Sequence, residues 1–73
     1  MPRKVRALKA DLRRAGFTSD TKRGKGSHSV WQHPLVPQNE VTLAGHDGDD
    51  AQSYQERDVR RALDALKEAL RSL

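Results

Sequence analysis

The spacing of apolar residues divides this chain of 73 residues into two helical ends and a middle segment without a helical period. Near the N-terminus the apolar positions recur every three or four residues, at Val5, Leu8, Leu12 and Ala15. A second set near the C-terminus recurs in the same way, at Val59, Ala62, Leu63, Leu66 and Leu70. Each segment is predicted to form a helix whose apolar face must be buried against another element.

Residue types at the boundaries indicate where these helices begin and end. Pro2 suits a first helical turn, and Gly16 suits the left-handed position that often follows a helix, so we predict a helix over residues 2–15. Ser53 followed by Glu56 has the form of a capping box, which predicts Ser53 as the N-cap of the second helix.

Three short segments between the helices are typical of strands: residues 17–23, 27–33 and 40–44. Gly24 and Gly26 mark a turn between the first two, and a loop with Pro34 and Pro37 leads to the third. Short links of this kind favour an antiparallel meander. The predicted fold is α+β in the order α-β-β-β-α, with both helices on one face of the sheet and the other face open to solvent.

Size and composition restrict what such a fold can do. A chain of 8.2 kDa with 34% apolar residues has a thin core, so we expect one domain over residues 1–73 without a large ligand pocket, which excludes Rossmann and barrel enzymes. The absence of cysteine excludes thiolate metal sites and fits a reducing compartment. Because neither a signal-peptide pattern nor an apolar run of roughly 20 residues is present, we expect a cytoplasmic protein with no membrane partner.

Basic residues are concentrated in the N-terminal third of the chain. Residues 1–25 have a net charge of +7, whereas residues 26–73 have a net charge of −3. The basic residues of the first segment are Arg3, Lys4, Arg6, Lys9, Arg13, Arg14, Lys22, Arg23 and Lys25. This distribution favours a surface that binds a polyanion, and the alternative is a cationic helix face exposed only to water.

The second predicted strand carries the most informative side chains. Side chains alternate along a strand, so Ser29, Trp31 and His33 share one face while His28 and Val30 share the other. Trp31 is the largest apolar side chain and should face the helices, which leaves His28 on the open face. An imidazole titrates near neutral pH and could move a proton while neighbouring cations hold a phosphate. The alternative is an ordinary surface histidine.

The order of these features resembles the HicA-type toxins of bacterial and archaeal toxin–antitoxin pairs. The resemblance rests on a helix, the sequence GKGSH, an aromatic residue three positions later, HP, a third strand and an amphipathic helix. The segment LAGHDGDDAQSYQERDVRRAL also resembles the tail of a subgroup of these toxins. The resemblance implies a fold like the double-stranded-RNA-binding domain, ribonuclease activity on mRNA, and a HicB-type antitoxin that masks this activity.

The functional histidine of that family corresponds to His28. Many members have a second histidine directly after it, where this chain has Ser29. Because Ser29 is predicted to lie on the core side, this difference should not remove the catalytic group.

The implied mechanism needs no metal or other cofactor. As a hypothesis, His28 accepts the proton of a ribose 2′-hydroxyl, which attacks the adjacent phosphorus, so RNA is cleaved and DNA is spared. Lys25, Lys22 or Arg23 would neutralise the negative charge that develops on the phosphorane. With Gly26 and Ser27 of the turn they form the predicted RNA-binding segment. An acidic antitoxin is expected to compete with RNA for the His28 face.

Other functions fit the sequence less well. A non-catalytic double-stranded-RNA-binding module is the main alternative, but such modules usually begin their second helix with lysines that grip phosphates. Here that helix begins with Tyr54, Gln55 and Glu56 after an acidic loop. A helix-turn-helix is less favoured because about 40 residues of strand-like sequence separate the two helices.

Several polar residues near the site have alternative interpretations. His46, Asp47, Asp49 and Asp50 match no calcium loop, so we expect a solvated acidic turn. His33 is predicted to be buried and hydrogen-bonded rather than catalytic. Tyr54 is expected to pack at the start of its helix, and Ser27 to be a turn residue rather than a nucleophile.

Overall fold

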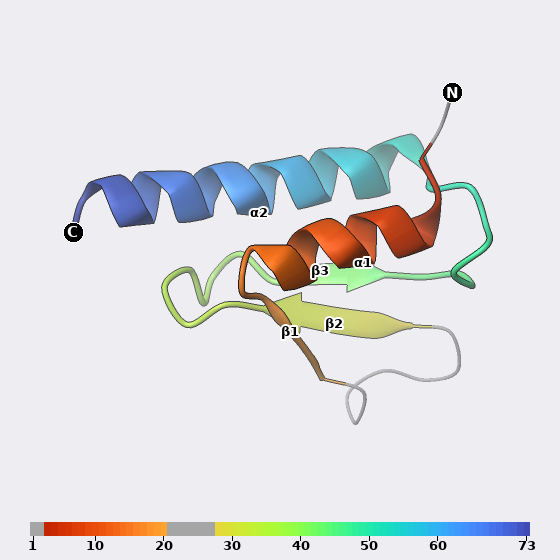
Figure 1. The fold of residues 1–73 in the computed structure, drawn as a ribbon, viewed down its shortest axis with the longest axis horizontal. Coiled ribbons are helices and arrows are strands. Elements are labelled where there is room, and N and C mark those ends of the chain that lie inside the picture. The colour runs from red at the N-terminus through yellow and green to blue at the C-terminus, as the bar shows by residue number, and fades with distance from the viewer. Residues whose placement is uncertain (1–2, 21–27) are drawn as a thin grey trace.

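The computed structural model describes residues 3–20 and 28–73. The elements are α1 (Val5–Arg14), β1 (Thr18–Asp20), β2 (Ser29–Gln32), β3 (Val41–Leu43) and α2 (Ser53–Arg71). The strands form one antiparallel sheet in the order β1-β2-β3, and both helices lie on the same side of it (Figure 1). The predicted α+β fold and its element order are therefore confirmed.

The end of α1 follows the prediction made from Gly16. This glycine has a φ of 99°, in the left-handed region that favours glycine. The N–H of Phe17 donates to the carbonyl oxygen of Leu12 at 2.9 Å, and the N–H of Gly16 donates to that of Arg13 at 3.1 Å. This pair of bonds is a Schellman motif, which turns the chain from α1 toward β1.

The start of α2 differs from the prediction by one residue. The N-cap is Gln52 rather than Ser53, and the backbone N–H of Gln52 donates to Oε1 of Gln55 at 2.8 Å. The buried Gln55 amide also donates through Nε2 to the carbonyl oxygen of Ala44 at 2.9 Å. The prediction of a Ser53–Glu56 capping box is wrong because the Gln55 side chain satisfies both the helix start and the end of β3.

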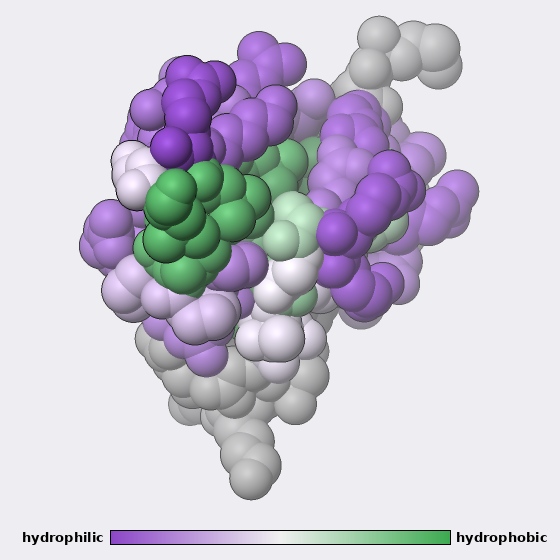
Figure 2. Space-filling view, turned by 60° about the vertical axis from the view of Figure 1, so that its left-hand side comes forward, coloured by the Kyte–Doolittle hydropathy of each residue, from purple (hydrophilic) through white to green (hydrophobic). Residues whose placement is uncertain are grey.

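The core lies between the sheet and the two helices. Its main side chains are Val5, Leu8, Leu12, Phe17, Trp31, Val36, Val41, Leu43, Val59, Ala62 and Leu66. Among the described residues, the large apolar side chains left exposed include Leu70 and Leu73, and Figure 2 shows a hydrophobic patch on the side where α2 ends. No helix among residues 3–20 and 28–73 is long and apolar enough to cross a membrane.

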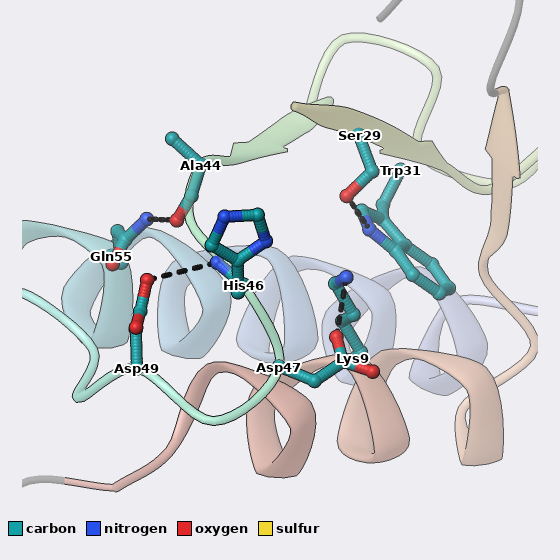
Figure 3. A network of polar contacts seen from close by, with 8 residues as sticks. All are labelled: Lys9, Ser29, Trp31, Ala44, His46, Asp47, Asp49 and Gln55. Carbon is teal, nitrogen blue, oxygen red and sulfur yellow. Dashed lines mark hydrogen bonds and ion pairs between the residues drawn. The ribbon is translucent and has the colours of Figure 1, made fainter. Parts of the chain in front are cut away.

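The acidic loop before α2 packs against the start of α1. The backbone N–H groups of Val5 and Arg6 donate to the carbonyl oxygens of Asp49 and Asp47 at 2.9 and 3.2 Å. The first N–H groups of a helix have no acceptor within the helix, so this loop supplies the acceptors for α1. The Lys9 ammonium also donates to the Asp47 carboxylate at 2.7 Å (Figure 3). Its hydrogen bond and positive charge lower the pKa of Asp47, with smaller contributions from Arg13 and Arg6.

Candidate functional site

The candidate catalytic residue His28 lies directly before β2, and its side chain is exposed. By the alternation of the strand it shares a face with Val30 and Gln32. The cross-strand partners of those two residues are Thr42 and Thr18, whose side chains are also exposed. No described element covers this face in Figure 1. The imidazole therefore stands at the edge of a sheet face that carries polar side chains accessible to a large ligand.

The opposite face of β2 explains why His28 points away from the helices. Trp31 is buried, and its indole N–H donates to Oγ of the buried Ser29 at 2.9 Å (Figure 3). The guanidinium carbon of Arg13 lies over the indole, 5.5 Å from the ring centroid. Because Ser29 and Trp31 face the core, as predicted from the alternation, the residue before Ser29 is directed to the other side.

Replacing Ser29 by alanine should destabilise the fold without changing His28. The variant leaves the buried indole N–H without its acceptor, and an unsatisfied buried donor costs about 1–3 kcal/mol of unfolding free energy. Urea denaturation measures this loss. Ser19→Ala is the matched control because Ser19 is exposed on β1 opposite Trp31, and it should change stability by less than about 0.5 kcal/mol. Equal effects of the two variants would contradict the role assigned to the Ser29 hydroxyl.

The predicted RNA-binding residues Lys22, Arg23, Lys25, Gly26 and Ser27 lie outside the described residues. Their arrangement around His28 stays a prediction. Several basic residues of the N-terminal third that the structure describes are paired with carboxylates, which the net charge of this segment does not reveal. Lys4 pairs with Asp50 at 2.6 Å, and Lys9 pairs with Asp47.

Arg3 also pairs with a carboxylate, that of Asp11, which raises the pKa of Arg3. The three ion pairs involve Arg3, Lys4 and Lys9, and all three residues belong to the basic surface predicted from the sequence. Acidic side chains from α1 itself and from the loop before α2 thus neutralise much of the charge at the start of α1. The expectation that the whole N-terminal third presents free positive charge to a polyanion is accordingly too broad.

The second histidine of the β2 segment has a structural role. Nδ1 of His33 accepts the backbone N–H of Leu35 at 3.0 Å, and its ring meets Phe17 edge-on with the ring centroids 5.2 Å apart. The predicted hydrogen bond of His33 is therefore confirmed. The side chain is half-buried, however, whereas the sequence predicts full burial. Tyr54 is 49% exposed, so at the start of α2 it packs only in part.

The carboxylates of the acidic loop are used within the protein. Asp47 and Asp50 pair with lysines of the α1 segment, and Oδ2 of Asp49 accepts the backbone N–H of His46 at 2.9 Å. Among the described residues, no group of three or more potential ligands could hold a metal ion. The role of this loop as a cap of α1 could not be predicted from the sequence, because the loop lies about 40 residues from the helix it caps and no sequence motif connects them.

Comparison with known proteins gives one finding about the family. Neither a curated protein nor a solved structure matches the chain significantly. A family model described as the HicA toxin of bacterial toxin–antitoxin systems matches residues 5–69. The match begins at the first residue of α1, ends near the end of α2 and includes His28 and the whole sheet. Because this match covers most of the chain and the fold has the order α-β-β-β-α, the chain belongs to the HicA toxin family.

Proposed function

We propose that this toxin is an mRNA-cleaving endoribonuclease of a type II toxin–antitoxin system, with His28 as its single catalytic histidine. The observation that carries the proposal is the exposed His28 imidazole beside an uncovered polar face of the sheet. A flat face of this kind admits a polynucleotide, whereas a thin core has no space to enclose a small substrate. The absence of cysteine is in keeping with action in the cytoplasm.

In the proposed reaction His28 accepts the proton of a ribose 2′-hydroxyl as general base. The 2′-oxygen attacks the adjacent phosphorus, and the bond from phosphorus to the 5′-oxygen of the next nucleotide breaks. The products are a 2′,3′-cyclic phosphate and a 5′-hydroxyl, whose proton comes from solvent or from an acid not identified by the sequence. Lys22, Arg23 and Lys25 neutralise the charge on the phosphorane, while Gly26 and Ser27 contact the backbone of the RNA.

Features of α2 favour cleavage over simple binding of double-stranded RNA. A non-catalytic module grips phosphates with lysines at the start of its second helix. In this chain the first turn of α2 carries Glu56, and the loop before it exposes Asp47, Asp49 and Asp50. Asp47 and Asp50 already pair with Lys9 and Lys4, so this region offers acidic side chains and paired lysines in place of lysines free to grip phosphates. A HicB-type antitoxin with acidic groups is the proposed inhibitor, and it would cover the His28 face.

The proposal is tested by incubating the purified protein with a long RNA and with DNA of the same sequence, each with and without EDTA. We expect cleavage of the RNA alone, insensitive to EDTA, with 2′,3′-cyclic phosphate ends. Cleavage of the DNA, or loss of RNA cleavage with EDTA, would contradict the 2′-hydroxyl mechanism. Binding of RNA without any scission would support the non-catalytic module instead.

A further inference from the structure

Helix α2 extends well beyond the helix that packs beside it. α2 has 19 residues and α1 has 10, which correspond to roughly 28 and 15 Å at the rise of an α-helix. The two helices begin at the same end of the molecule, so the last turns of α2 project past the end of α1 (Figure 1). The apolar face of α2 consequently loses its cover toward the C-terminal end. The exposed fraction of its leucines rises from 5% at Leu66 to 52% at Leu70.

An open groove of about 860 Å³ runs along the two helices and includes this uncovered face. Its apolar lining comes from both helices: Leu8, Ala15, Val59, Leu63, Leu66 and Leu70. We call it the α1–α2 groove. None of its lining residues comes from the sheet, so the groove belongs to the helical layer, whereas His28 belongs to the other face. Figure 2 shows the hydrophobic patch between hydrophilic side chains at the end of this groove.

Most of the charged side chains beside the groove are positive, and several of them have no ion-pair partner within the described part of the chain. Arg14, Arg60 and Lys67 line it, and none of them has an ion-pair partner among residues 3–20 and 28–73. This differs from Lys4 and Lys9, which pair with the acidic loop. Arg57 adds a fourth cation, and Arg3, which pairs with Asp11, is the fifth. Glu56 and Asp64 are the other acidic side chains of the lining. The groove is therefore apolar at its centre with an excess of available positive charge at its sides.

We propose that the α1–α2 groove binds an amphipathic helix of the antitoxin whose apolar face is flanked by Asp and Glu. This inference rests on the antitoxin partner of the proposed function, and it adds a second contact surface away from His28. Helices commonly bind in apolar grooves between two other helices through residues three and four positions apart. Leu63 and Leu70 would contact the apolar face of that helix. Arg14, Arg60 and Lys67 would pair with its carboxylates.

The antitoxin would then contact two surfaces on opposite sides of the toxin, the α1–α2 groove and the His28 face, and each would contribute differently to inhibition. The groove supplies buried apolar area, which contributes most of the affinity in protein complexes. The His28 face contributes the competition with RNA. Changes in the groove should consequently weaken the antitoxin complex while the free toxin cleaves RNA as before.

The test measures the dissociation constant of the complex by titration calorimetry with the purified HicB-type antitoxin. Leu70→Asp and Arg60→Glu should each raise it at least about tenfold, the size expected for central interface residues. Leu35→Asp and Arg61→Glu are the matched controls. Leu35 is 41% exposed but does not line the groove, and Arg61 is exposed beside Arg60 without lining it. Both controls should change the dissociation constant less than about threefold, within the usual range for residues outside an interface.

Circular dichroism melting and RNA cleavage by each free variant accompany the titration. All four substitutions are at exposed side chains, so the thermal midpoints and the cleavage rates should stay close to wild type. Wild-type affinity in both groove variants, or equal weakening in the controls, would overturn the proposal. So would sedimentation of the free wild-type toxin as a dimer that Leu70→Asp dissociates, because the occupant would then be a second copy. Failure of the free wild-type toxin to cleave RNA would instead count against the proposed function.

Discussion

Replacing His28 by alanine is expected to slow RNA cleavage by about 10²–10⁴-fold, the usual contribution of one general acid–base group. The imidazole is exposed and precedes β2, so its loss removes no core contact. The thermal midpoint should therefore stay at the wild-type value. The measurement is the initial rate of cleavage of a labelled RNA, with a melting curve of the same preparation.

His46→Ala is the matched control for this experiment. His46 is also an exposed histidine, but it lies in the acidic loop, where its backbone N–H donates to Asp49. Its variant should cleave at the wild-type rate. Retained cleavage by His28→Ala, or an equal loss in His46→Ala, would falsify the assignment of His28 as the catalytic histidine.

The position of His28 could be predicted from the sequence because it depends on a local rule. In a chain with a single tryptophan and a thin core, burial of Trp31 decides which face of β2 meets the helices. Alternation then places Ser29 with Trp31 and His28 on the other side. The buried hydrogen bond between Ser29 and Trp31 adds a reason for the serine that the sequence did not provide.

Features that depend on contacts between distant segments could not be predicted. Lys9 and Asp47 are 38 residues apart, and Lys4 and Asp50 are 46 residues apart. No periodicity or motif connects these positions, so the charge count treated the lysines as free. The N-cap of α2 was misplaced for a similar reason. A capping box at Ser53 is a local pattern, whereas Gln55 also bonds the distant carbonyl of Ala44.

The same long-range pairing changes how the charge of this protein should be interpreted. The acidic loop neutralises the start of α1, so free positive charge is left elsewhere. In the described part of the chain, one such place is the α1–α2 groove, on the helical side. The other cations of the proposed site belong to the segment before His28. A polyanion and an acidic partner helix can accordingly meet different faces of one small domain.

The largest effect on stability is expected from Trp31→Ala. Truncating a buried tryptophan costs about 3–5 kcal/mol of unfolding free energy. A domain of this length has a total of about 4–11 kcal/mol, so the variant should lose a large share of its stability and melt at a markedly lower temperature. The indole packs in the core, donates to Ser29 Oγ and lies beneath Arg13, and alanine removes all three contacts. RNA cleavage should fall with the folded fraction, because β2 no longer holds His28.

Two further variants distinguish the loss of aromatic packing from the loss of the hydrogen bond to Ser29. Their free energies of unfolding are measured by urea denaturation followed by circular dichroism. Tyr54→Ala is the matched aromatic control, and it should cost less than about 1 kcal/mol because its ring is half exposed. Trp31→Phe keeps an aromatic ring and loses the N–H, so combining it with Ser29→Ala should cost less than the sum of the single changes. Additive costs, or a loss in Tyr54→Ala as large as that in Trp31→Ala, would show that this buried pair does not anchor β2, the strand that follows His28.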